Sequence, residues 1–373
     1  MENCIKILKC FTLLLCFGFV SNLKAEITFR DGQFPELVTS ARALAIGNAY
    51  VAGANDAASV FYNPAGLGSI REWHFHLSNL TLEWNKNWQN VSSGGKVTDA
   101  AGNFPQAFSL DGLRKLQVDG GVQEKPTFSR FSLAPNFTTR YLSFGYLYSK
   151  KTRTQVRDDD GTDKFEYADR LDHGPYVAAN LSLFGGVFKL GVMGVTLFRK
   201  EAFGSVDAAD TITLEDDDYK SGTAYTLLGG AKLTLPITWL PTLAIKSNNL
   251  NSAKFHGAAG KTPDKLRHSV DLGFSLTPQI GNILRLHMEV NYKDFGDEYN
   301  MDTKRKIMAG MELNIARVMF FRFGISDGFG SFGIGMSTKR LKVDLTTYAV
   351  DLSDSSLRGI EDRRFIFGFS SGI

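Results

Sequence analysis

The chain has 373 residues, with 42 Lys and Arg against 39 Asp and Glu, which leaves a net charge of only +3. This near balance argues against nucleic acid as a partner. After residue 25 no uninterrupted apolar run approaches the roughly 18 residues of a membrane-spanning helix. All three cysteines lie before residue 26, which excludes a disulfide framework and a cysteine metal site from the rest of the chain.

The segment before residue 26 has the pattern of a secretory signal peptide. Two lysines precede an apolar run over 10–20, and Ala25 supplies a small residue at a cleavage point, so we expect the mature chain to begin at Glu26. A lipid anchor at Cys16 is the weaker alternative, because Leu15 stands where lipidation requires a small residue. An exported chain without membrane helices is periplasmic, extracellular or an outer-membrane barrel.

The next stretch, residues 39–70, is rich in small residues, almost uncharged and without strand-like alternation. Thr39 or Ser40 can cap a short helix over 41–46, and Gly47 can end it. The composition predicts a compact helical plug.

The plug ends in a short motif. Asp56 can cap a second short turn over 57–61, and Pro64 prevents its continuation and pushes Asn63 out of helical geometry. We therefore divide the chain into a signal peptide (1–25), an N-terminal hatch (26–70) and a barrel (71–373).

From residue 71 onward the sequence predicts strand after strand. In the clearest case, residues 283–293, apolar and polar side chains alternate with period two, as in a strand with one face against an apolar medium. The fourteen expected strands cover 71–84, 127–137, 140–152, 173–185, 187–200, 222–235, 239–248, 267–278, 282–293, 305–315, 317–326, 330–338, 340–350 and 362–371.

The connections between these strands are sorted by length. Those after even-numbered strands are short, whereas those after odd-numbered strands are mostly long and polar, with 153–172 and 201–221 among the long ones. Such sorting is typical of a transmembrane β-barrel with short periplasmic turns and long outer loops. The sequence thus predicts an all-β fold: an antiparallel transmembrane barrel of about 14 strands with a small helical hatch inside, at the periplasmic end.

Several motifs that suggest other chemistry fail in their context. Gly328–Gly333 matches a dinucleotide fingerprint, but a strand rather than a helix follows it. Asp158–Gly161 does not fit the calcium-loop template, and it and Glu215–Asp218 are expected to be solvated loops, with cations bridging to lipopolysaccharide as the alternative. His74 and His76 share a strand face without a third ligand. We expect no metal, no cofactor and no catalytic residue, although a phospholipase-type barrel enzyme is an alternative.

The long loop over 85–125 contains a candidate ligand contact. Its apolar residues Phe108, Leu110, Leu113 and Leu116 are spaced for a short amphipathic helix. They can form either a packed cap of the loop or a hydrophobic landing site for an apolar ligand.

The plug sequence resembles the FadL-like outer-membrane family, which includes long-chain fatty acid and toluene transporters, and also its PorV/PorQ branch. The resemblance rests on about 30 residues: Ala41-Arg42-Ala43, Gly47-Asn48-Ala49, Asp56-Ala57 and Tyr62-Asn63-Pro64-Ala65-Gly66-Leu67. It implies a fourteen-stranded barrel plugged by a hatch that carries an Asn-Pro-Ala motif. The chain departs from barrels that end on an aromatic residue, since it ends in Ile373.

The resemblance implies passive, hatch-gated transport of long-chain fatty acids or other hydrophobic small molecules. From the signal peptide and the barrel pattern we expect the protein to lie in the outer membrane of a Gram-negative-type bacterium, and we expect a monomer. The hatch residues expected to gate are Asp56, Asn63, Pro64, Ala65 and Gly66. A bent strand near Gly145 or Gly191 could open the wall to the bilayer. The alternatives are a PorV-like component of a protein secretion system that acts through its outer loops and, for the motif alone, a simple turn into the first strand.

Overall fold

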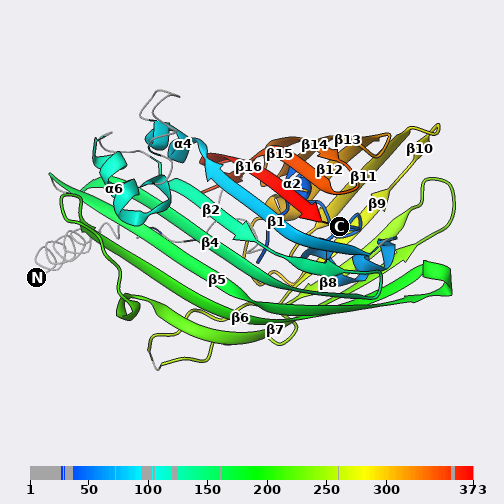
Figure 1. Cartoon of the computed structure of the whole chain (residues 1–373), viewed down its shortest axis with the longest axis horizontal. Coiled ribbons are helices and arrows are strands. Elements are labelled where there is room, and N and C mark those ends of the chain that lie inside the picture. The colour runs from blue at the N-terminus through cyan, green and yellow to red at the C-terminus, as the bar shows by residue number, and fades with distance from the viewer. Residues whose placement is uncertain are drawn as a thin grey trace, which may run out of the picture.

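The protein is a closed antiparallel β-barrel with a small helical segment inside it, as the computed structural model shows (Figure 1). The structure describes residues 27, 29, 37–71, 73–93, 103, 106–119, 125–159, 161–258, 260–353 and 358–372. The expected signal peptide, 1–25, lies outside the described residues. No helix in the described part of the chain is long and apolar enough to cross a membrane.

Sixteen strand segments make up the sheet, but the barrel has 14 strands. Segments β2 and β3 are successive parts of one strand beside β4, and β9 and β10 both pair with β11. The segments are β1 (His74–Asn85), β2 (Thr127–Leu133), β3 (Asn136–Thr138), β4 (Leu142–Asp159), β5 (Thr162–Leu183), β6 (Phe188–Asp207), β7 (Lys220–Thr234), β8 (Thr242–Asn248), β9 (Ser269–Leu276), β10 (Gln279–Ile280), β11 (Leu284–Tyr292), β12 (Ile307–Ile315), β13 (Met319–Ser326), β14 (Phe329–Ser337), β15 (Leu341–Asp351) and β16 (Glu361–Gly372).

Each strand pairs with its neighbours in sequence, and β16 closes the barrel by pairing with β1. Closure satisfies every strand edge, which a sheet in lipid requires. The predicted fold class and strand number are confirmed. The turns at 139–141, 184–187, 316–318 and 338–340 define what we call the short-turn end, and the opposite rim is the long-loop end.

Strand length divides the wall into two regions. Strands β4, β5 and β6 have 18, 22 and 20 residues, whereas β11, β12 and β13 have 9, 9 and 8. At about 3.4 Å per residue, β5 is roughly 75 Å long and β11 roughly 30 Å. The long strands therefore project beyond the rest of the barrel at the long-loop end (Figure 1).

This projection corrects two predicted loops. Residues 153–172 are largely strand, because β4 runs to Asp159 and β5 begins at Thr162. Of residues 201–221, the first seven belong to β6, which runs to Asp207, and the loop is confined to 208–219. Above the apolar band of a membrane, outward side chains no longer need to be apolar, so the contrast that marks a strand in the sequence disappears.

Alternation across the wall is plain in β6. Leu190 and Val192 point outward and are exposed, whereas Met193, Val195 and Leu197 are buried inside the barrel. Since successive side chains of a strand point to opposite faces, one strand supplies both an apolar outer surface and the lumen lining.

Of the predicted hatch (26–70), the structure describes residues 37–70 without a gap, and this part, which we call the hatch from here on, lies inside the lumen (Figure 1). It holds the helix α2 (Ala41–Ala45), the short helix α3 (Ser59–Tyr62) and the 3-10 segment η1 (Pro64–Ser69). The Ser40 side chain accepts a hydrogen bond from the amide of Ala43, which confirms the predicted helix start. The remaining helical segments are α4 (Lys86–Ser93), η2 (Gln106–Phe108), α6 (Leu110–Asp119), η3 (Phe184–Gly186), η4 (Asp216–Asp218) and η5 (Thr303–Lys306).

Candidate functional site

The hatch is buried almost throughout. Between residues 38 and 70, only Arg42, 55–57 and Ser69 are not fully buried. Because small side chains dominate this stretch, its backbone can lie directly against the barrel wall.

Glycines of the wall receive the hatch backbone at several points. A Cβ at Gly310 of β12 would lie 2.2 Å from the carbonyl oxygen of Ile46, and one at Gly324 of β13 would lie 2.1 Å from the amide nitrogen of Gly47. Real Cβ atoms do not approach backbone so closely, so any side chain at these positions displaces the hatch. We call such residues the wall glycines.

The Asn-Pro-Ala motif lies against two more wall glycines, on the opposite side of the barrel. A Cβ at Gly191 of β6 would lie 2.2 Å from the amide nitrogen of Ala65, and one at Gly230 of β7 would lie 2.0 Å from Asn63 Oδ1. Gly191 is therefore a contact site for the hatch within a regular ladder, not the bend that the sequence suggested.

Asn63 holds the motif together by hydrogen bonds. Its side-chain amide donates to the carbonyl oxygen of Val51 at 3.0 Å, and its Oδ1 accepts from the amide of Ala65 at 3.1 Å. The side chain is fully buried, at 0% exposure, so these bonds offset its desolvation. Pro64 occupies the first position of η1, where a missing N–H costs nothing.

Charged side chains hold the other end of the hatch. Arg42 donates twice to Glu312 of β12, with Nε–Oε2 at 2.7 Å and Nη2–Oε1 at 2.8 Å. Glu312 also accepts from Arg322 Nε at 2.6 Å, and Arg322 donates to Asp344 of β15 at 2.6 Å. We call this set the charged latch. It could not be predicted from the sequence, because its members are far apart in the chain.

Asp56 joins the charged latch at the short-turn end. Lys342 Nζ lies 3.2 Å from its Oδ2, and Arg42 Nη1 lies 3.4 Å from the same atom. Burial by itself raises the pKa of Asp56, but the charges of Lys342 and Arg42 outweigh burial and hold the pKa well below its usual range. Asp56 also accepts from the amide of Ala58 at 3.1 Å, but it is not the predicted cap, because α3 begins at Ser59 with Ala58 as its N-cap and has no side-chain cap.

Polar side chains of the wall also bind the hatch backbone. Glu289 of β11 accepts from the amides of Ala52 and Gly53 at 2.6 and 2.7 Å. Lys232 of β7 donates to the carbonyl oxygen of Ala54 at 2.9 Å. The hatch is therefore docked through specific bonds and does not simply fill space.

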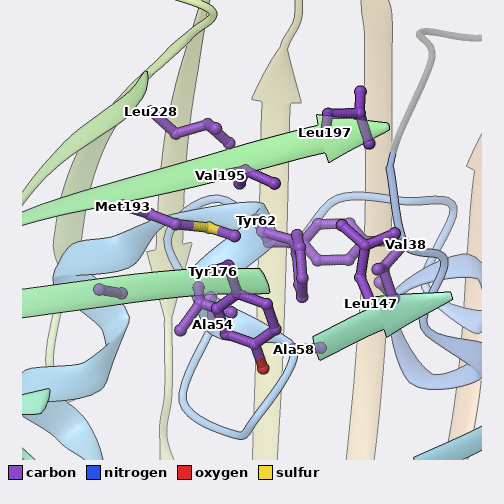
Figure 2. Packing of buried hydrophobic residues seen from close by; sticks show 14 of the residues in the cluster. Val38, Ala54, Ala58, Tyr62, Leu147, Tyr176, Met193, Val195, Leu197 and Leu228 are labelled. Atoms are coloured by element: carbon purple, nitrogen blue, oxygen red, sulfur yellow. The ribbon is translucent and has the colours of Figure 1, made fainter. Parts of the chain in front are cut away.

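On the side of the hatch toward the long-loop end, the lumen is lined by apolar side chains. We call this lining the apolar belt; Figure 2 shows several of its members around Tyr62 of the hatch. It consists of Leu147, Tyr176, Ala178, Met193, Val195, Leu197, Ala224 and Leu228, from β4 to β7. Phe61 of the hatch packs edge-on against Tyr176, with ring centroids 5.0 Å apart.

A small cavity lies beside Phe61 of the hatch. It has a volume of about 30 Å³ and is lined by Phe61, Leu228 and Leu266, with the Arg199–Asp172 ion pair at its edge. A volume of this size is close to that of a single water molecule. This cavity is therefore too small for an organic ligand.

The apolar loop residues lie at the long-loop end, on helix α6 and beside it. Leu113 is buried beside Trp88 and Ala107, and Phe108 and Leu116 pack against the same cluster. Leu110 packs against a separate cluster in the projecting strands. The predicted amphipathic helix is confirmed, and these contacts are those of a packed cap.

Other sequence motifs have no ligand geometry in the described residues. Gly328 forms a tight hairpin turn between β13 and β14, with a φ of 82°. No group of three or more His, Cys, Asp or Glu within the described part of the chain could hold a metal ion. His76 lies beside Ser370, with Nδ1 and Oγ 2.8 Å apart.

The barrel and its docked hatch define a plugged fourteen-stranded barrel, the architecture of the FadL-like outer-membrane transporters. Solved structures agree with this at the level of the fold. The chain is similar to the CymD monoaromatic hydrocarbon channel (9% identity, TM-score 0.51, 91% of this chain and 98% of that one covered). It is also similar to the P. putida toluene transporter TodX (10% identity, TM-score 0.50, 91% of this chain and 99% of that one covered).

Sequence comparisons give no further assignment. No model of a known protein family matches the chain, and no curated protein matches it. The FadL-like fold expected from the hatch motif is confirmed by these structural likenesses.

Proposed function

We propose that the protein is an outer-membrane channel for passive passage of hydrophobic small molecules, aromatic hydrocarbons or long-chain fatty acids, with the hatch as its gate. The observation that carries the proposal is the apolar belt: at the level of the belt, the inward-facing side chains of β4 to β7 are mostly apolar, where a water-filled pore is polar. The toluene and monoaromatic hydrocarbon channels of the same fold support the ligand class.

Passage requires the hatch to move. Phe61 and Tyr62 pack directly against the belt and fill the lumen at this level, so a molecule such as toluene cannot pass while they stay in place. Asp56 at the charged latch and Asn63, Pro64, Ala65 and Gly66 at the opposite wall are the gating residues in this proposal, because they hold the two ends of the hatch.

A sideways exit has a candidate position in the wall. Tyr146 of β4 pairs with Pro175 of β5, and its amide donates to the carbonyl oxygen of Pro135, which interrupts β2 and β3. Each proline lacks the N–H that a ladder needs, so hydrogen bonding is weakest along this line. Gly145, predicted from the sequence as a bend, lies next to it in the same strand.

The apolar residues Phe108, Leu110, Leu113 and Leu116 remain a proposed entry surface. The structure favours their role as a cap, since Leu113 is buried. We further propose that the protein is a monomer, contacts lipopolysaccharide at its long-loop rim and needs no cofactor or catalytic residue.

The test is uptake of radiolabelled toluene and oleate by cells with and without the protein. We expect faster uptake of at least one of these molecules and unchanged uptake of a hydrophilic sugar. Equal uptake of several apolar compounds with and without the protein would contradict the proposal.

One observation favours the secretion-partner alternative. The projecting strands β4, β5 and β6 present a wall beyond the rest of the rim, which suits a protein partner outside the cell (Figure 1). This alternative predicts stable co-purification with other envelope proteins through the projecting strands, together with unchanged uptake.

A further inference from the structure

A second cavity lies at the short-turn end, on the other side of the hatch from the apolar belt. Its volume is about 420 Å³, and its lining includes eight Arg or Lys side chains but only two carboxylates, Asp56 and Asp344. We call it the basic cavity.

The charged latch accounts for three of the eight cations. Arg42, Arg322 and Lys342 are paired with Glu312, Asp56 and Asp344. The other five line the cavity without an ion pair to any carboxylate among the described residues: Arg71, Arg285, Arg317, Lys339 and Arg340.

These five come from separate parts of the chain. Arg285 on β11 faces the like charges of Arg317, in the turn after β12, and of Arg71, just before β1. Lys339 and Arg340 form the turn between β14 and β15. Like charges repel, so their convergence on one cavity favours a bound anion there.

The chemistry of the lining narrows the class of anion. Four of the five cations are arginines, whose planar guanidinium groups bind phosphate or carboxylate oxygens two at a time. Several cations converging on one volume favour a multiply charged group over a single carboxylate. Uncharged donors, including Asn79, Ser132 and Ser370, line the same cavity.

We propose that the basic cavity binds a phosphate-bearing anion, either a free phosphate ester or the head group of a phospholipid. The site is separate from the apolar belt and does not rest on the proposed transport function. Binding can therefore be measured without transport, and either proposal can fail alone.

The first experiment is calorimetric titration of the whole protein, in neutral detergent, with inorganic phosphate and glycerol 3-phosphate. We expect binding that the double variant Arg285→Gln/Arg317→Gln weakens by about tenfold or more. The matched control, Lys254→Gln/Lys265→Gln, removes the same charge from the exposed loop after β8 and should change binding by less than about twofold. Heat-modifiable mobility on a gel verifies that each variant still forms the barrel.

The second experiment distinguishes the sources. The protein is incubated with phosphatidylglycerol vesicles, and native mass spectrometry counts the retained lipid. If the parent protein and the control retain lipid and the double variant does not, the ligand is a phospholipid head group. If only the phosphate ester binds, the ligand is a soluble molecule.

Three outcomes would overturn the proposal. The first is that neither probe distinguishes the double variant from the control. The second is that acetate binds as tightly as phosphate. The third is that a hexaglutamate peptide binds and phosphate does not compete with it, which would indicate an acidic protein segment as the partner.

Discussion

The two sides of the barrel wall hold the hatch in different ways. The β4–β7 side faces it with the apolar belt, and beside the belt lie the wall glycines Gly191 and Gly230. The β11–β16 side holds it with the charged latch, with Glu289 and with hydroxyls such as Ser331, which bonds both Ala45 and Gly47. The apolar side can exchange protein for an apolar ligand at little cost, whereas the polar side fixes where the hatch sits.

The largest effect is expected from breaking the charged latch. The variant Glu312→Leu leaves Arg42 and Arg322 buried without their shared carboxylate, which should lower the free energy of unfolding by about 3–5 kcal/mol. Urea unfolding followed by tryptophan fluorescence measures it. The control Glu298→Leu, at an exposed loop position, should stay within about 0.5 kcal/mol. Equal curves for the two variants would show that the latch does not hold the hatch.

The second largest loss of stability is expected from replacing a wall glycine. In Gly324→Val the new side chain overlaps the backbone of Gly47, so we expect a loss of about 1–3 kcal/mol and faster amide exchange over residues 41–47. Hydrogen–deuterium exchange with mass spectrometry measures this. Gly330→Val is the matched control, because the nearest atom to a Cβ there is 4.0 Å away. Protection of 41–47 in both variants would mean that the fit is looser than described.

Replacing residues of the Asn-Pro-Ala motif, at the opposite wall, should cause a similar or smaller loss of stability. Asn63→Ala removes the bonds to Val51 and Ala65 from a buried site, at a cost of about 1–2 kcal/mol. Combined with Pro64→Ala, it should change the rate of toluene uptake while the barrel still assembles. Unchanged uptake would favour the alternative in which Asn63 to Gly66 merely turns the chain into β1.

The apolar belt can be tested by isosteric substitutions on one strand. Val195→Thr places a hydroxyl in the lumen and should slow toluene uptake, with a stability loss of about 1 kcal/mol. Val192→Thr makes the same change on the outward face of β6. The proposal requires that only the inward substitution slows uptake at equal amounts of folded protein; a slower rate in both would place the effect in the wall rather than the lumen.

The smallest effect concerns pH. Because the pKa of Asp56 is lower in the folded protein than the usual 3.8, its ion pairs stabilise the hatch above that pH, and this stability is lost as the pH falls through the lowered value. The melting temperature should therefore fall more steeply for the parent protein than for Asp56→Asn between about pH 4 and pH 2. Parallel curves would contradict the role of Asp56.

Much of this architecture could be predicted from local sequence. Fourteen strands follow from period-two alternation, and the hatch follows from its small residues and its caps. The extensions of β4, β5 and β6 could not be predicted. Outside the lipid band, a polar sequence such as that of residues 157–164 is compatible with either a strand or a loop.

The site was only partly predictable. Asn63 and Pro64 carry a local signature, but Glu312, the wall carboxylate that binds Arg42, lies 270 positions away on β12. Glu312 looks like any polar residue on the lumen side of a strand. Only the closed barrel brings such residues together, and the same is true of Arg71 and Arg285 in the basic cavity.

The central claim is that the hatch must move for a hydrophobic molecule to pass, and a reversible crosslink tests it directly. In Ala41→Cys/Gly368→Cys, expressed from Glu26 onward behind a standard export signal, the two Cβ positions lie about 3.1 Å apart, near the about 3.5–4.5 Å of a disulfide. Toluene flux into proteoliposomes is then measured with the disulfide formed and after its reduction. Our account predicts background flux when the hatch is tied to β16 and restored flux on reduction; equal flux in both states would contradict it.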